Sequence, residues 1–207
     1  MIELYEFALS GHCHKVRLLL SLLNVGYTSH LLNSVTGEHK AADFLTKNPL
    51  GQVPVLKDGD IVIRDSQAIL VYLARAYGSD SWFPVDAKNS AEIVGWLSTA
   101  ANEIARGPNA LRLHHKFARA IDIAEATQIT DNILNVLDNH LAKRDWLVTD
   151  TVTIADVAIY PYIALANEGN VDLAPFDFIN RWLARLESLQ GFITMPGIEL
   201  QPGSQHS

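Results

Sequence analysis

The chain has 207 residues, of which 48% are hydrophobic and 19% are charged, as in a folded globular protein and unlike a disordered one. The formal net charge is −7 and no block of basic residues occurs, so nucleic acid is not an expected partner. One cysteine excludes an internal disulfide and fits a reducing compartment. The first residues start a strand pattern rather than a signal peptide, and no apolar stretch approaches the roughly 18 residues of a membrane span. We therefore expect a soluble, cytoplasmic protein.

The first part of the chain alternates between strand and helix patterns. In chain order these patterns predict a strand at residues 2–7, a helix from Lys15 to about Gly26, a strand at residues 27–32, a short helix at residues 41–46, a hairpin around Asp58-Gly59, and a helix from Ser66 to Gly78. A helix between two strands forces those strands to run parallel. This order therefore predicts a thioredoxin-like α/β unit.

The stretch at residues 48–78 carries the first functional indication. Pro54 stands at the head of a predicted strand, a position that indicates an edge or a cis peptide bond. A cis proline would leave the backbone of Val53 free to pair with an extended, peptide-like ligand. Asp65 and Ser66 begin the following helix, where N–H groups favour a carboxylate. A small peptide with a carboxylate would suit both features.

These residues resemble a known family. The pattern N-P-x-G-x-V-P-x-L, followed by D-S-x-A-I-x-x-Y-L, is similar to the glutathione-binding half of the soluble glutathione S-transferases. The resemblance implies that Gln52, Val53 and Pro54 hold the cysteinyl part of glutathione. It also implies that Asp65 faces the γ-glutamyl ammonium and Ser66 binds the γ-glutamyl carboxylate. His39 and Lys40 lie where several classes of the family bind the glycine carboxylate.

The rest of the chain is helical in pattern. Long helices are predicted after Asp86, with a kink at Gly107-Pro108, and over residues 121–143 and 175–189. Thr153 and Asp156 have the spacing of a capping box and resemble the buried capping motif of the same family, so we expect a structural role for both. The fold implied is an α/β thioredoxin-like domain followed by an all-α domain. The expected division is residues 1–78, a linker at 79–86, and a helical domain at 87–207 that ends in a mobile polar tail.

Ser10 is the predicted catalytic residue. The segment from Ser10 to Arg17 resembles the Ser-x-x-Cys loop of serine-type transferases, in which the serine hydroxyl donates to the glutathione sulfur. A free thiol with a pKa near 8.5 is mostly protonated at neutral pH, so such a donor is needed to favour the thiolate. Cys13 competes for the role: it is either an inert buried thiol or a thiol that forms a mixed disulfide with glutathione.

A polar cluster around Gly107-Pro108 indicates where a second substrate would bind. The expected pocket residues are His12, Asn102, Arg106 and Asn109, with Arg112, His114 and His115 nearby. The adjacent histidines do not converge on one point, so no metal is expected. The resemblance implies a homodimeric glutathione transferase that attacks a small electrophile. Isomerase, dehalogenase or peroxidase activity stays open, as do a binding protein without turnover and a thiol–disulfide oxidoreductase that uses Cys13.

Overall fold

A four-stranded sheet in the order β2-β1-β3-β4 forms the first part of the structure, a computed structural model that describes residues 1–201. Strand β1 (Ile2–Glu6) pairs in parallel with β2 (Tyr27–Leu31) and antiparallel with β3 (Val55–Asp58), which forms a hairpin with β4 (Ile61–Arg64). The first two strands are parallel because helix α1 (Gly11–Leu22) connects them. The predicted mixed sheet and hairpin are confirmed.

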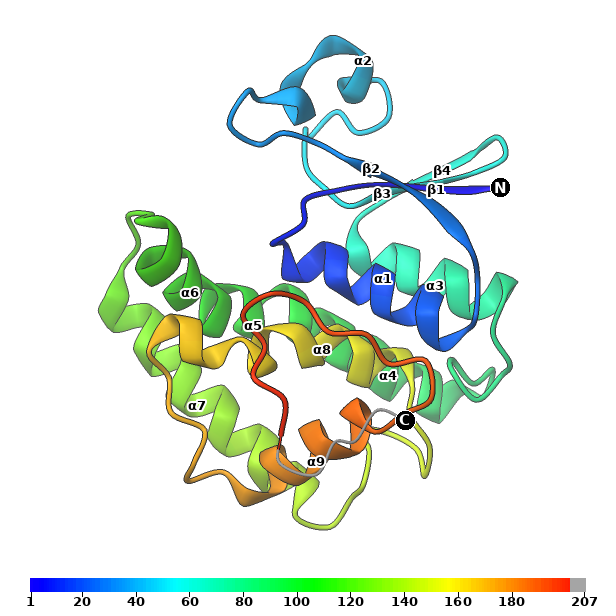
Figure 1. Cartoon of the computed structure of the whole chain (residues 1–207). Helices are drawn as coiled ribbons and strands as arrows, with labels where there is room; N and C mark the ends of the chain where they lie inside the picture. The colour runs from blue at the N-terminus through cyan, green and yellow to red at the C-terminus, as the bar shows by residue number, and fades with distance from the viewer. Residues whose placement is uncertain (202–207) are drawn as a thin grey trace.

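Helices cover both faces of this sheet. Helices α1 and α3 (Ser66–Ala76) lie together on one face, and the short helix α2 (Ala42–Leu45) lies beyond the other (Figure 1). The alternation of β1 explains this arrangement, because successive side chains of a strand point to opposite faces. Leu4 is fully buried in the core that includes α1 and α3, whereas Tyr5 contacts the ring of Phe44 on α2. The sequence pattern thus positions the helices whose first residues form the candidate site.

The second part of the described chain is helical, and its predicted kink is present together with a second break. Asn102 and Gly107 both leave helical geometry, with ψ of −81° and −101°. The expected long helix is therefore three helices rather than one with a single kink. In chain order the elements not yet named are η1 (Glu38–Lys40), α4 (Ala87–Ala101), α5 (Glu103–Arg106), α6 (Pro108–Phe117), α7 (Ile123–Leu141), α8 (Ile154–Ala164), η2 (Ala166–Gly169) and α9 (Asp177–Glu187).

Helix α8 lies at the centre of the molecule and contacts α1, α3 and α4 (Figure 1). Its first ten residues are all buried, so no water can reach the N–H groups at its start. The predicted capping box meets this need: Thr153 accepts from Ala155 N–H, and Asp156 accepts from the backbone N–H of Thr153 at 2.9 Å. Asp156 also accepts from the indole of Trp182 at 3.0 Å. The cap therefore fixes the helix against which the first helix of the sheet layer packs.

The end of the described chain packs against the helical part rather than leaving it. Asn167 donates to Glu199 at 3.0 Å, and Ile198 packs against the core. The expected mobility of the tail stays a prediction, and residues 202–207 lie outside the described residues. In the part of the chain that the structure describes, no helix is long and apolar enough to cross a membrane. The domain boundaries at 79–86 remain a prediction.

Candidate functional site

Ser10 lies at the start of α1 and caps it. Its backbone is extended, and its Oγ accepts the N–H of Cys13 at 3.3 Å. A hydroxyl at this position satisfies one of the donors that a helix start leaves free. Its O–H also lies within hydrogen-bonding reach of the Cys13 thiol and the Tyr162 hydroxyl, so it must turn from these groups to donate to a ligand. The N-cap role and a donor role toward a ligand are therefore compatible in one side chain.

Two arginines hold the loop in which Ser10 lies. Arg17, within α1, donates to the carbonyl oxygen of Ala8 at 3.1 Å and forms an ion pair with the buried Glu6. Arg112, from α6, donates to the carbonyl oxygen of Leu9 at 3.1 Å and to Glu168 at 2.6 Å. Arg112 is almost fully buried, so both of its contacts are shielded from water. The helical part of the molecule thus fixes the residue next to Ser10.

A cis peptide bond joins Val53 and Pro54, as predicted. The loop before it is ordered by the buried Asn48, which donates to the carbonyl oxygen of Gln52 at 2.7 Å. Gln52 is exposed and Val53 is half-buried, so both can meet a ligand at the surface.

His39 and Lys40, from η1, lie near the same loop. Lys40 donates to the carbonyl oxygen of Leu50 at 3.1 Å, and the ring of His39 contacts the ring of Phe7. Burial, and then the charge of Lys40, lowers the pKa of His39. The structure therefore brings η1, the loop before Pro54 and the end of β1 close together.

Asp65 and Ser66 form the head of α3. Asp65 has a φ of 76°, in the left-handed region that residues other than glycine rarely adopt, and its carboxylate accepts from Gln67 and Ala68 at 2.9 and 3.1 Å. These bonds satisfy two of the free N–H groups of the helix, and the Ser66 hydroxyl donates to Oε1 of Gln67 at 2.5 Å. The Oγ of Ser66 is buried and lies 3.4 Å from Nδ1 of His12. The heads of α1 and α3 therefore meet.

Tyr162 from α8 joins these two helix heads, a contact that no pattern in the sequence predicts. Its hydroxyl accepts the N–H of His12 at 3.2 Å, and its ring lies edge-on to the His12 ring with centroids 5.0 Å apart. Gly11 permits the approach, because a Cβ there would lie 2.6 Å from the Tyr162 ring. Burial raises the pKa of the Tyr162 phenol, so the group stays protonated. The glycine after Ser10 was the available signal for a close neighbour at this helix start.

Burial also sets the protonation of the residues that follow Ser10. It lowers the pKa of His12 to about 3 and raises the pKa of Cys13 to about 11, against the opposing hydrogen bond from Ser10. The Cys13 side chain has no exposed surface and accepts from the N–H of Phe7 at 3.5 Å. At neutral pH His12 is an uncharged imidazole and Cys13 is a thiol, which is a poor nucleophile and a poor partner for disulfide exchange.

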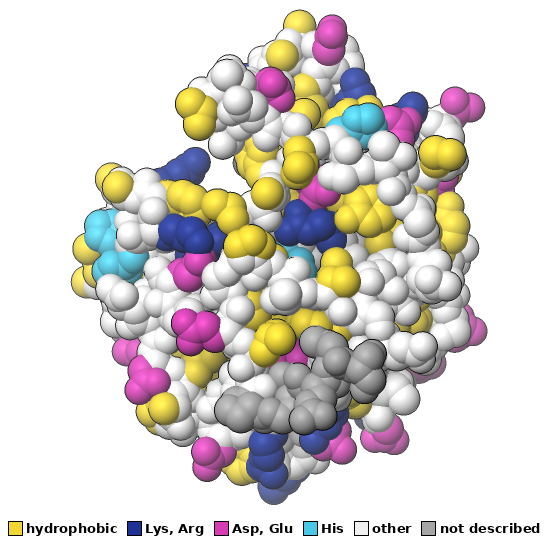
Figure 2. All heavy atoms as spheres, viewed as in Figure 1, with side chains coloured by type: hydrophobic (Ala, Val, Ile, Leu, Met, Phe, Trp, Pro, Cys, Tyr) yellow, Lys and Arg dark blue, Asp and Glu magenta, His cyan; other side chains and the backbone are white. Residues whose placement is uncertain are grey.

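The four residues expected around a second substrate do not form one cluster in the structure. His12 lies between Ser66 and Tyr162, as described, and Asn109 is buried at the start of α6. Asn102 is exposed and donates to Glu103, while Arg106 is exposed and pairs with Glu125 of α7. Figure 2 shows a notch between the part of the molecule that carries α2 and the part that carries α6, with hydrophobic and cationic side chains on its α6 side.

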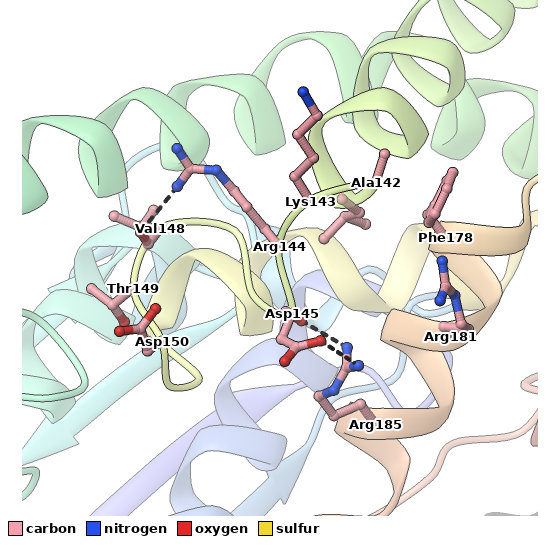
Figure 3. A pocket seen from close by; sticks show the side chains of 11 residues that line it. Ala142, Lys143, Arg144, Asp145, Val148, Thr149, Asp150, Phe178, Arg181 and Arg185 are labelled. Atoms are coloured by element: carbon pink, nitrogen blue, oxygen red, sulfur yellow. Dashed lines mark hydrogen bonds and ion pairs between the residues drawn. The ribbon is translucent and has the colours of Figure 1, made fainter.

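A second hollow, of about 460 Å³, lies at the opposite end of the helical part, between the loop after α7 and helix α9. Arg185 pairs with Asp145 there, and the Lys143 and Arg144 side chains point away from Arg181 (Figure 3). Its cationic groups therefore do not converge on one point, and none of the predicted site residues lines it. Among residues 1–201, no three His, Cys, Asp or Glu side chains gather as metal ligands would.

Comparison with known proteins gives one consistent result. Residues 4–81 match the family model for the N-terminal domain of glutathione S-transferases, and residues 100–190 match the model for the C-terminal domain. Glutathione S-transferase 3 of Zea mays is 32% identical over 177 residues, which cover 80% of this chain and 79% of that protein. GstB of Escherichia coli K12 is 29% identical over 195 residues, covering 90% of this chain and 93% of that protein.

The solved structures agree with the sequence relatives. The crystal structure of a possible glutathione S-transferase from Rhodopseudomonas palustris superimposes with a TM-score of 0.87 at 32% identity, and the match covers 94% of this chain and 97% of that one. The likeness therefore extends over both the sheet layer and the helical part.

Proposed function

Because the chain belongs to the glutathione S-transferase family, we propose that it binds glutathione and stabilises its thiolate for attack on a small electrophile. The observation that carries this proposal is the meeting of two helix heads beside a cis proline. Ser10 caps α1, Ser66 heads α3, and the Val53–Pro54 bond lies at the start of β3. Helix heads favour anions, and glutathione offers both a carboxylate and a thiolate.

The roles within this site follow the chemistry of each group. Ser10 is the proposed catalytic residue, which donates its O–H to the sulfur in a charge-assisted hydrogen bond. Ser66 takes the γ-glutamyl carboxylate, and Asp65 faces the ammonium. The backbone of Val53 pairs with the cysteinyl part beside Gln52 and Pro54. His39 and Lys40 are placed near the glycine end, because η1 lies against the loop that ends at Gln52.

The second substrate is proposed to bind on the side of the helical part, near His12 and Asn109, with Asn102 and Arg106 at its outer edge. His12 is uncharged at neutral pH because burial lowers its pKa to about 3, so it would contribute packing and a hydrogen bond rather than charge. The burial and protonation of Cys13 argue against the alternative of a thiol–disulfide oxidoreductase. We keep isomerisation, dehalogenation and peroxide reduction as possible reactions of the same glutathione site.

The protein is further proposed to be a cytoplasmic homodimer whose interface involves α3 and α4. Val94 on α4 is 50% exposed and Tyr77, at the end of α3, is 42% exposed, which supports an apolar contact there. Sedimentation measures the mass directly. Twice the chain mass of 22.9 kDa is expected at micromolar concentration, and the mass of a single chain would contradict the dimer.

Calorimetric titration with glutathione tests the proposed function. We expect binding, and Ser66→Ala should weaken it by about 1–3 kcal/mol, because the buried carboxylate loses a hydrogen-bond partner. Ser98→Ala is the matched control, since the Ser98 hydroxyl bonds only to the carbonyl oxygen of Val94 on the exposed side of α4. If the wild-type protein binds no glutathione at millimolar concentration, the proposal fails.

A further inference from the structure

Lys15 is a buried cation whose ammonium makes no hydrogen bond or ion pair within residues 1–201. Its side chain has no exposed surface. Burying an ammonium group without a partner is costly, and the group responds by losing its proton more readily. Burial accordingly lowers the pKa of Lys15 to about 7, and the charge of Asp65 opposes the shift. An anionic ligand bound nearby would neutralise this buried ammonium and remove the cost.

The ammonium group lies where the heads of two helices meet. Side chains of an α-helix lean toward its N-terminus, so Lys15 extends from the second turn of α1 back toward the first. Its Nζ is 5.5 Å from the centroid of the Tyr162 ring, on α8, and one turn earlier His12 contacts Ser66 at the head of α3. Helix α1 packs against both α3 and α8 (Figure 1).

The acidic group whose charge acts on the Lys15 ammonium does not form an ion pair with it. Asp65 is the carboxylate whose charge acts on Lys15, but its hydrogen bonds go to the N–H groups of Gln67 and Ala68. The starts of α1 and α3 each add partial positive charge, which repels a cation. The positive charge of the ammonium and the partial positive charges at the starts of α1 and α3 therefore add up. His12 is uncharged, and the Tyr162 ring supplies a cation–π attraction but no negative charge.

We propose that Lys15 is the buried counter-charge for the γ-glutamyl carboxylate of bound glutathione at the head of α3, an inference that rests on the function proposed above. The carboxylate accepts from the Ser66 hydroxyl, which exchanges its bond to Gln67 for this one, and its charge offsets that of the buried ammonium. Lys15 is thus a binding residue that supplements the hydroxyl and N–H donors. It makes the site select a ligand that carries an anion at this end.

Calorimetry on Lys15→Met tests the inference, because methionine keeps the length of the side chain and removes its charge. Glutathione affinity should fall roughly 10-fold, because the attraction between the buried ammonium and the carboxylate is lost. An analogue in which 4-aminobutyrate replaces the γ-glutamyl residue lacks the carboxylate and should bind the wild type and the variant equally. Lys88→Met, on the exposed start of α4, is the matched control and should leave both affinities unchanged.

A second ligand separates the carboxylate from the sulfur. S-methylglutathione keeps the carboxylate and cannot form a thiolate, so its affinity should depend on Lys15 as strongly as that of glutathione. If the Lys15→Met effect disappears with S-methylglutathione, or is equally large with the decarboxylated analogue, the carboxylate assignment is wrong. If the wild type binds glutathione and Lys15→Met binds it equally well, the inference fails while the proposed function stands. Absence of binding by the wild type overturns both.

Thermal unfolding of the same variant distinguishes a binding role from a packing role. Without ligand, Lys15→Met should raise the melting temperature, because it removes an unpaired buried charge. With saturating glutathione, the wild type should gain more stability than the variant, since its affinity is higher. A lysine that served only as packing would lower the melting temperature equally with and without ligand when replaced, and that result would contradict the proposal.

Discussion

The hydroxyl of Tyr162 accepts the N–H of His12 at 3.2 Å, and this bond ties the central helix of the helical part to the first turn of α1. Residue 12 follows Ser10 by two positions, so the bond fixes the helix start from which the proposed donor projects. The geometry of the site is therefore shared between the two halves of the chain, and it depends on the ring of Tyr162 reaching the backbone of Gly11.

Substitution of Gly11 tests this close approach. Gly11→Ala should destabilise the protein by about 1–3 kcal/mol, because the new methyl group would lie 2.6 Å from the Tyr162 ring and the packing must shift. Gly95→Ala is the matched control: Gly95 lies within α4 with no atom near the added Cβ, so the change should stabilise by roughly 0.5–1 kcal/mol. Urea unfolding measures the change in the free energy of unfolding for each variant. An increase for Gly11→Ala would contradict the described contact.

The cap of α8 makes a second prediction about stability. Asp156 accepts from Thr153, from Leu147 at 3.0 Å and from the indole of Trp182 at 3.0 Å, all of them buried. Asp156→Ala should cost at least about 3 kcal/mol, because several buried donors each lose an acceptor at about 1–3 kcal/mol. Denaturant unfolding followed by tryptophan fluorescence measures the loss.

The exposed cap of α4 supplies the comparison. Asp86 is exposed and accepts from the N–H and the side chain of Asn89, so Asp86→Ala should cost about 1 kcal/mol. Equal losses for Asp86→Ala and Asp156→Ala would show that the buried network adds nothing to an ordinary helix cap.

Whether the sequence predicted a feature of the fold or the site depends on how far apart in sequence its interacting residues lie. The capping box at Thr153 and Asp156 and the hairpin at Asp58-Gly59 are formed by residues close in sequence, so their spacing alone predicted them. The helix head at Ser66 was also predicted, since it is a local signal, whereas α1 begins at Gly11 and not at Lys15, where the sequence pattern predicted its start. These local features placed the candidate site without any knowledge of how the helices pack.

The contacts between distant helices were not predictable in the same way. Tyr162 and Arg112 reach the Ser10 loop only because α8 and α6 pack at particular angles, which no local pattern specifies. The second break of the long helix, at Asn102, also escaped prediction, because apolar residues continue at helical spacing on both sides of it. Lys15 follows the same rule, since nothing near it in sequence shows that α1 is covered on the side toward α3 and α8.

The buried His14 predicts how the free energy of unfolding changes with pH. Burial lowers the pKa of His14 to about 3, whereas an unfolded chain titrates near 6.5, so the unfolded state binds more protons between these values. The free energy of unfolding should therefore decrease as the pH falls from 6.5 toward 3. His14→Leu should remove part of this decrease, and unfolding curves at pH 7, 5.5 and 4 compare the two proteins. A difference between them that is independent of pH would contradict the assignment.

The pKa of the bound glutathione thiol tests the central claim most directly, and difference absorbance of the thiolate across pH measures it. Ser10→Ala should raise this pKa and reduce conjugation roughly 10- to 1000-fold, as loss of one positioned donor does in other enzymes. Its affinity for glutathione should change little, because the hydroxyl serves the sulfur. Cys13→Ala should leave both the pKa and turnover nearly intact. If Cys13→Ala abolishes turnover while Ser10→Ala leaves the thiol pKa unchanged, the assignment of Ser10 is wrong.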